Sequence, residues 1–275
     1  MGQLFTLLEN VAPLVKASST TITMAPTYLG QATRIQVGGQ SYTTSSTITL
    51  NTATTGFNGL DTGSLASNQL YYIYAVVSSG LLGLVASTAA PGTGPTGFLA
   101  WKEVGRFRTF LGSAAIAVVI NRILGNNRAA SKIQLFSDTT GWTASNFGTV
   151  TALTSKEFLV GNTISAQIVF TSGTPVASSA ILNLPYSMDT TLLGSEPKIV
   201  GNWFSKAGTS SIYNTGREAY LLYDGSTANQ LFRTTDTSSN AYVKENANVS
   251  FSSGAKADIA LNSVPVVEFA GLFTD

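Results

Sequence analysis

Residues 70–87 read LYYIYAVVSSGLLGLVAS, and this stretch decides the fold. Aromatic and β-branched residues dominate its first half, and such residues favour pleated strands. The segment Ser78-Ser79-Gly80 has the composition of a tight turn. The stretch therefore predicts two paired strands, of which the first is covered on both faces.

A membrane helix is the alternative interpretation, because residues 62–101 carry no charged side chain. The turn residues in the middle of the apolar run do not fit a continuous spanning helix, and Pro91 and Pro95 follow soon after it. We therefore expect a hairpin here and no membrane insertion.

Strand-like segments continue on both sides of this hairpin. Polar and apolar residues alternate over 33–37 and over 40–50, and Gly38-Gly39 between them has the composition of a two-residue hairpin turn. Asp224-Gly225 is a second strong turn signal. The remaining predicted strands span residues 101–109, 114–120, 157–170, 180–184, 198–204, 217–223, 230–235, 241–245 and 264–269.

The spacing of these short strands predicts an all-β fold with two β-sandwich or jelly-roll-like domains. We expect the first β-domain at residues 21–121 and the second at 135–275. Residues 122–134 between them are polar and rich in turn formers, which is typical of a linker. Residues 1–20 form a separate N-terminal attachment segment, either helical or extended.

The attachment segment carries apolar residues at helical spacing, and Pro13 would end or kink such a helix. A helix this short is marginal in water, so its apolar stripe needs a surface to pack on. Two interpretations stay open: an arm folded onto its own domain, or a segment that docks on other chains or trimerises. The apolar residues are Leu4, Leu7, Leu8, Val11 and Leu14.

Charge is sparse and balanced. Charged side chains make up 11% of the 275 residues, and 15 basic residues stand against 14 acidic ones. A nucleic-acid-binding protein needs a concentrated basic surface, and the basic residues here are scattered. We therefore expect no nucleic-acid partner. Few ions would have to lose water if identical chains packed together, which favours self-assembly.

The chain contains no His and no Cys. This excludes Ser-His-Asp triads, Cys-His pairs, disulfides and the usual zinc sites. We expect no catalytic residue, no metal and no cofactor. The alternative of another class is a carboxylate-dependent glycan depolymerase, which needs two acids about 5–10 Å apart in a cleft. The acids considered for it are Asp189, Glu196, Glu218, Asp224 and Asp236.

Residues 92–97 read GTGPTG, which matches the dinucleotide-binding pattern G-x-G-x-x-G. That pattern binds a pyrophosphate only where a helix begins directly after it. Pro91, Pro95 and the predicted strand 101–109 leave no place for such a helix. We interpret this segment as a loop between strands.

Aromatic side chains in the second half could stack on sugar rings if their faces are exposed. Burial in a core or an interface is the alternative, because aromatic residues bury large areas. The candidate glycan contacts are Trp142, Trp203, Tyr213 and Tyr220.

Five segments over residues 30–120 occur in an order that resembles a module of tailed-bacteriophage virion structural proteins, often described as tail fibres. They are GLDTGSL at 59–65, LYYIY at 70–74, LVAS at 84–87, PTGF at 95–98 and VGRFRT at 104–109. The second half is similar to the β-rich domain that often follows this module, through WT at 142–143, VGNW at 200–203 and VPVV at 264–267. The family pattern usually closes with Gly-Trp, whereas residues 268–271 here read EFAG.

The resemblance implies a virion location, a homotrimer and no cofactor. We therefore expect a structural, non-enzymatic component of a bacteriophage particle, namely a trimeric tail-fibre or spike-like appendage that contacts the host surface. A capsid decoration or head-fibre protein is the alternative within the same class, and a free lectin-like module lies outside it. The expected partners are copies of the chain itself, a tail adaptor or capsid bound through the N-terminal segment, and host surface glycan.

Overall fold

The computed structural model describes residues 14–26, 32–121, 134–136, 142–206, 219–236, 242–247 and 251–272. Strands hold 54% of the described residues and helices 4%, so the predicted all-β class is confirmed. The chain divides into two compact units, one up to Ala129 and one from Ala130 to Phe273. This division falls within the predicted linker 122–134. The candidate residues Leu4, Leu7, Leu8, Val11 and Tyr213 lie outside the described residues.

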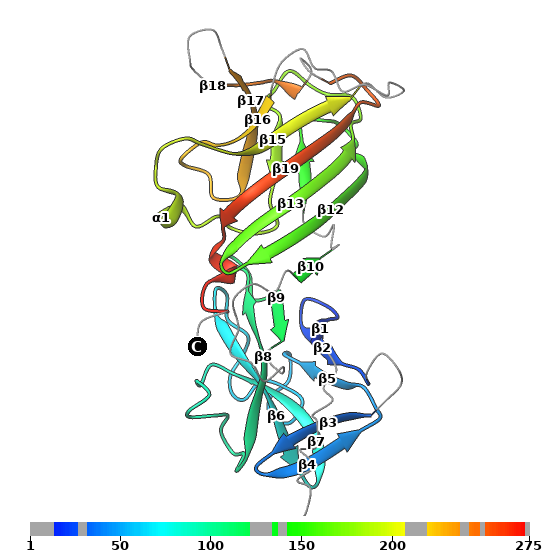
Figure 1. Cartoon of the computed structure of the whole chain (residues 1–275), viewed down its shortest axis with the longest axis vertical. Helices are drawn as coiled ribbons and strands as arrows, with labels where there is room; N and C mark the ends of the chain where they lie inside the picture. Colours follow the sequence, from blue (N-terminus) through cyan, green and yellow to red (C-terminus); the bar gives the residue numbers. More distant parts are fainter. Residues whose placement is uncertain are drawn as a thin grey trace, which may run out of the picture. The chain divides into compact units, whose positions relative to one another are not determined.

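Unit 1 consists of three antiparallel groups of strands in its described part (Figure 1). A three-stranded sheet has the order β1-β2-β5, a hairpin joins β3 to β4, and a four-stranded sheet has the order β7-β6-β8-β9. These strands are β1 (Leu14–Lys16), β2 (Thr21–Met24), β3 (Thr33–Val37), β4 (Gln40–Thr44), β5 (Ile48–Asn51), β6 (Leu70–Ser78), β7 (Leu81–Ser87), β8 (Trp101–Thr109) and β9 (Ile116–Asn121).

Strand β6 is the centre of unit 1, and it is covered on both faces as predicted. Ile73 and Ala75 belong to the main core, which all three groups of strands share. Tyr74 and Val76 point to the other face, where they form a smaller apolar cluster. The hairpin of β6 and β7 turns at residues 79–80, and both of these residues have positive φ. The predicted turn Gly38-Gly39 likewise has positive φ at both positions, as a type I′ turn requires.

At Leu14, the attachment segment has the extended form of the two forms that the sequence left open. Leu14 begins strand β1, which pairs antiparallel with β2, and its side chain is buried in the main core of unit 1. The side-chain amide of Asn121 accepts a hydrogen bond from the Leu14 backbone N–H and donates one to the Leu14 carbonyl. The helical spacing that links Leu14 to the residues before it therefore does not describe its structure. Residues 14–20 fold onto their own unit.

Unit 2 forms one antiparallel sheet of ten strands in its described part, and β12, β13, β19 and β15 lie side by side in it (Figure 1). The path runs β10-β12-β13-β19-β15-β16-β17-β14-β11, and β18 pairs with β17. These strands are β10 (Gln134–Phe136), β11 (Thr143–Ser145), β12 (Thr151–Val160), β13 (Thr163–Thr171), β14 (Ile181–Asn183), β15 (Lys198–Lys206), β16 (Ala219–Tyr223), β17 (Gln230–Asp236), β18 (Tyr242–Lys244) and β19 (Lys256–Pro265).

The sheet of unit 2 curls until its two ends meet. Phe147, just after the terminal strand β11, lies 5.1 Å from Phe170 on β13 and 5.9 Å from Trp203 on β15, measured between ring centroids. Phe251 completes this aromatic core at 5.0 Å from Phe147. Because aromatic rings bury large areas, this cluster holds the curled sheet together and gives unit 2 its sandwich-like core.

Two predicted strands of the second half were wrong in detail. Residues 157–170 are not one strand but parts of β12 and β13, which turn at residues 161–162. Residues 264–269 contain only the end of β19, followed by a short 3₁₀ helix, η1 (Val267–Phe269). One further helix, α1 (Thr190–Leu193), follows β14. Within the described residues, no helix is long and apolar enough to cross a membrane.

Candidate functional site

The two tryptophans predicted to bind glycan are core residues of unit 2. The Trp203 side chain is 1% exposed and packs within the aromatic core. The Trp142 side chain is also 1% exposed, and its indole N–H donates to the carboxylate of Glu157. A sugar ring cannot reach either indole face, so this prediction was wrong for both residues. Tyr220 is half-buried on β16.

The buried carboxylate of Glu157 explains why Trp142 is inside. Glu157 lies on β12, is 1% exposed, and also accepts hydrogen bonds from Ser155 Oγ at 3.3 Å and from the Tyr186 hydroxyl at 3.2 Å. Trp142 precedes β11, at the opposite end of the sheet path from β10 and β12. The pair of Trp142 and Glu157 therefore joins the two ends of the curled sheet.

Three of the acids considered for glycan cleavage lie among the described residues, and the backbone at Gly225, next to Asp224, closely approaches that of Ser195 and Glu196. Asp189 caps α1 by accepting from the backbone N–H groups of Thr191 and Leu192. Glu196 is exposed. Asp224 Oδ2 accepts from Lys244 Nζ at 2.9 Å, and Asp224 Oδ1 caps the predicted turn at residues 224–225. Glu218 and the side chain of Asp236 lie outside the described residues.

The environment of Asp224 fits a structural carboxylate. Burial raises its pKa, but hydrogen bonds from Lys244, from the backbone of Ser226 and Thr227 and from the Ser226 hydroxyl outweigh this effect and lower the pKa from 3.8 to about 2. A general acid needs the opposite shift, because it must keep its proton near neutral pH. Asp224 is therefore suited to holding a turn and not to donating a proton.

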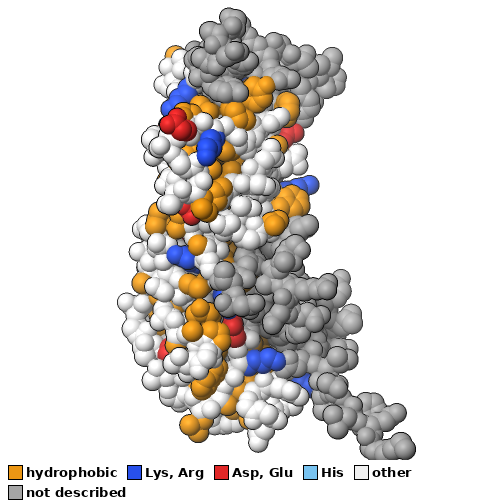
Figure 2. Space-filling view, turned by 60° about the vertical axis from the view of Figure 1, so that its left-hand side comes forward, with side chains coloured by type: hydrophobic (Ala, Val, Ile, Leu, Met, Phe, Trp, Pro, Cys, Tyr) orange, Lys and Arg blue, Asp and Glu red, His pale blue; other side chains and the backbone are white. Residues whose placement is uncertain are grey.

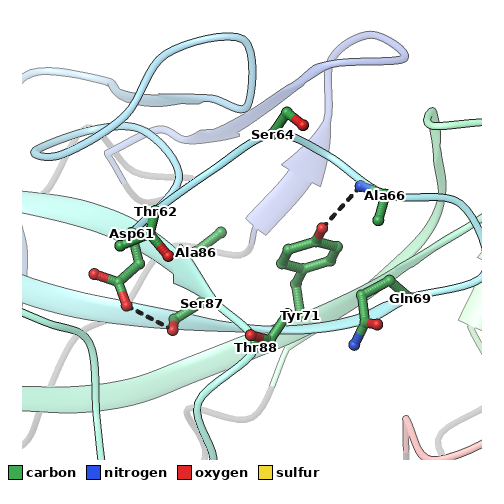
Figure 3. Close-up of a pocket in the computed structure, with 9 residues that line it drawn as sticks. All are labelled: Asp61, Thr62, Ser64, Ala66, Gln69, Tyr71, Ala86, Ser87 and Thr88. Carbon is green, nitrogen blue, oxygen red and sulfur yellow. Dashed lines mark hydrogen bonds between the residues drawn. The ribbon is translucent and has the colours of Figure 1, made fainter.

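A polar pocket of about 220 Å³ lies in unit 1 beside the end of β7 (Figure 3). It is built from the loop between β5 and β6, the first part of β6, and the residues around the end of β7. Figure 3 shows the ring of Tyr71 with the loop residues around it. The residues that line the pocket are Asp61, Thr62, Ser64, Ala66, Gln69, Tyr71, Ala86, Ser87 and Thr88.

Asp61 connects three separate segments at this pocket. Its Oδ2 accepts from Ser87 Oγ at 2.8 Å, and its Oδ1 accepts from the backbone N–H of Thr96 at 2.8 Å. The backbone N–H of Asp61 in turn donates to the carbonyl of Ala86 at 2.7 Å. One carboxylate thus ties the loop after β5 both to β7 and to the segment 92–97, which is a loop between strands as predicted.

The loop that carries Asp61 is held by its own backbone. Leu60 forms bridges with Thr55 and Ala86, and its side chain is buried. A Cβ atom on Gly59 would lie 2.4 Å from the carbonyl oxygen of Thr54, which is too close for any other residue. Each residue of the stretch GLD at 59–61 therefore has its own role. Gly59 allows the close approach to the backbone of Thr54, Leu60 is buried, and the carboxylate of Asp61 accepts hydrogen bonds from two other segments.

Tyr71 forms a fixed wall of the pocket. Its hydroxyl oxygen accepts from the backbone N–H of Ala66 at 2.9 Å, as Figure 3 shows. Its ring stacks on that of Phe107, with 4.9 Å between the centroids and 8° between the planes. Gln69 Nε2 donates to the carbonyl of Leu70 at 3.0 Å. These contacts set the positions of the side chains without a ligand.

The pocket can form hydrogen bonds but has no pair of carboxyl groups in its lining. Asp61 is the one acid among the nine lining residues, whereas glycoside hydrolysis uses a pair of carboxyl groups. Among the described residues, no group of three or more acids could hold a metal ion. The pocket is therefore suited to binding a polar molecule.

Comparison with known proteins adds no relative to this picture. No family model, no curated protein and no solved structure matches the chain.

Sequence reasoning singled out the stretch at 59–65 through its resemblance but did not expect a pocket there. The signal in the sequence was the string of small and hydroxylated residues around Asp61. The partners Ser87 and Thr96 could not be assigned to Asp61 without the pairing of β7 with the loop.

Proposed function

We propose that the chain is a structural, non-enzymatic component of a bacteriophage particle, a homotrimeric tail-fibre or spike-like appendage that contacts the host surface. The observation that carries this proposal is the meeting of GLDTGSL, LVAS and PTGF at Asp61. They are three of the five segments that carry the resemblance to virion proteins. Their hydrogen bonds to one carboxylate support reading them as parts of a single structural unit and not as unrelated short matches.

The surface of the chain supports assembly with other copies. Among the described residues that Figure 2 shows, most side chains are apolar or uncharged and few are charged. Several large apolar side chains are exposed, among them Leu99 at 103%, Leu81 at 66% and Leu192 at 60%. Burying apolar surface between chains contributes about 25 cal/mol per Å². Few ions would lose their water in the process, which keeps the cost of association low.

The attachment role belongs to the residues before Leu14. The side chain of Leu14 is buried in the core of unit 1, so it is not available to contact another virion protein. In our proposal, Leu4, Leu7, Leu8 and Val11 supply the contact with a tail adaptor or with the capsid. Variants that replace these four residues with Ser should therefore lose attachment to the particle and keep the fold of unit 1.

Antibody-gold labelling of intact particles tests the proposal. Label on the tail or on spikes is the expected result, and label spread over the capsid surface would favour a decoration or head-fibre protein instead. Purified particles that contain the protein neither by labelling nor by mass spectrometry would contradict the virion assignment. Incubation with host polysaccharides should release no reducing sugar ends, because Asp189 caps a helix and Asp224 forms an ion pair with Lys244.

A further inference from the structure

We propose that the Asp61 pocket of unit 1 binds one neutral sugar ring. Seven of its nine lining residues carry a side chain that can form hydrogen bonds, and the remaining two are Ala66 and Ala86. Hydroxyl and amide groups offer both donors and acceptors, which is what a ligand with several hydroxyl groups requires. This site goes beyond the proposed virion role, because it does not depend on where the chain is located.

Three hydroxyl groups at the pocket are available to a ligand. Thr62, Ser64 and Thr88 are exposed, and within the described residues their side chains form no hydrogen bond. Other polar groups of the lining are already engaged, since Ser87 Oγ donates to Asp61 and the Tyr71 hydroxyl accepts from Ala66. The exposed hydroxyls therefore form the part of the site that would make new hydrogen bonds.

The charge of the lining selects the class of ligand. A carboxylate only accepts hydrogen bonds, so the remaining acceptor positions of Asp61 suit the hydroxyl groups of a sugar. Each oxygen of Asp61 accepts one hydrogen bond from the protein, and a carboxylate has about four acceptor positions. The same carboxylate repels phosphate and carboxylate groups. An uncharged saccharide therefore fits the pocket better than a uronic acid, a sialic acid or a sugar phosphate.

The volume of the pocket limits the size of its ligand, and its fixed side chains favour binding. Its volume of about 220 Å³ is below the roughly 300–1,000 Å³ of pockets for drug-sized ligands, so a single ring is the largest unit it encloses. The exposed rim leaves a longer chain free to extend into solvent. Asp61 and Tyr71 are held by protein contacts already, which reduces the entropy lost on binding.

The test is saturation-transfer NMR and titration of the full chain with glucose, galactose, mannose, rhamnose and N-acetylglucosamine, together with glucuronic and sialic acid. The decisive variant is the triple change Thr62→Val, Ser64→Ala and Thr88→Val, which removes the free hydroxyls. The matched control is Ser41→Ala with Thr43→Val, which removes two exposed hydroxyls of β4 in the same unit.

At least one neutral sugar should bind, and the triple variant should weaken its binding by about tenfold or more at an unchanged melting temperature. The control should bind like the parent chain. If the triple variant unfolds, Thr88→Val alone should weaken binding about threefold or more. Three results would overturn the site: no neutral sugar binds, the triple variant binds as well as the parent, or an acidic sugar binds most tightly. Each of them would leave the virion assignment untouched.

Discussion

Two carboxylates, one in each unit, have opposite environments. In unit 1, Asp61 clamps loops at the surface and borders an open polar pocket. In unit 2, Glu157 is 1% exposed and is enclosed by Trp142 and Tyr186. Both units are all-β, so burial rather than residue type separates the two environments. The buried aromatic residues of unit 2 stabilise its fold, and in our proposal the hydroxylated residues of unit 1 contact a ligand.

We expect the largest loss of stability from a substitution in the aromatic core of unit 2. Trp203→Ala should destabilise the chain by about 3–5 kcal/mol, because it leaves a cavity among Phe147, Phe170 and Phe251. The neighbouring Phe204 is 47% exposed, so Phe204→Ala should cost less than about 1 kcal/mol. Urea unfolding of both variants measures the difference. Equal losses would contradict the assignment of Trp203 to the core.

Removing the buried acid should have the next largest effect. Glu157→Leu leaves the Trp142 indole N–H and the Tyr186 hydroxyl without this acceptor, which should cost about 2–4 kcal/mol. Glu157→Gln keeps one acceptor oxygen and should cost less. Hydrogen-exchange mass spectrometry should show faster exchange in β11 and β12, where the ends of the sheet meet. Slow exchange in both strands of the Leu variant would argue against this closure.

Removing the carboxylate of Asp61 in unit 1 should destabilise the chain less than removing that of Glu157. Asp61→Ala removes hydrogen bonds from Ser87 Oγ and Thr96, but Thr96 is exposed and its N–H can turn to water. We expect a loss of about 1–2 kcal/mol, with faster exchange confined to residues 59–65 and 92–97. Asp61→Asn serves as the control, because its one acceptor oxygen should retain part of the clamp. A loss larger than that of Glu157→Leu would reverse the contrast between the units.

The smallest effect depends on pH. The folded-state pKa of Asp224 is lowered to about 2, so its ionised form stabilises the fold above the ordinary pKa near 4. This contribution should disappear as the pH falls from about 4 to 2, and it should amount to about 1 kcal/mol after screening by solvent. Asp224→Asn should therefore be less stable than the parent at pH 6 and about equal to it at pH 2, as thermal unfolding would show.

Local patterns were sufficient to predict the centre of unit 1. The run of aromatic and β-branched residues at 70–77 and the turn after it gave a hairpin whose second strand has the predicted bounds, 81–87. In unit 2, the alternating pattern continues through residues 157–170 and hides the turn at Gly161. A glycine inside an alternating run is compatible with a strand, so the sequence did not mark this turn clearly.

The roles of the aromatic and acidic residues could not be predicted from sequence. Trp142 is buried because the sheet curls and brings Glu157 to it, which no local pattern around Trp142 reveals. Asp61 is part of a recognisable stretch, yet its partners lie 26 and 35 residues further along the chain. Sequence patterns thus predicted the all-β class and many of the strands, whereas the environment of each side chain follows from the three-dimensional fold.

Self-assembly is the central claim, and the mass of the purified full chain in solution tests it most directly. Light scattering coupled to size-exclusion chromatography should give three times the 28.7 kDa of one chain, and the value should not change on dilution. A mass of 28.7 kDa at every concentration would contradict the claim, because the exposed apolar side chains would then have no partner copy to cover them.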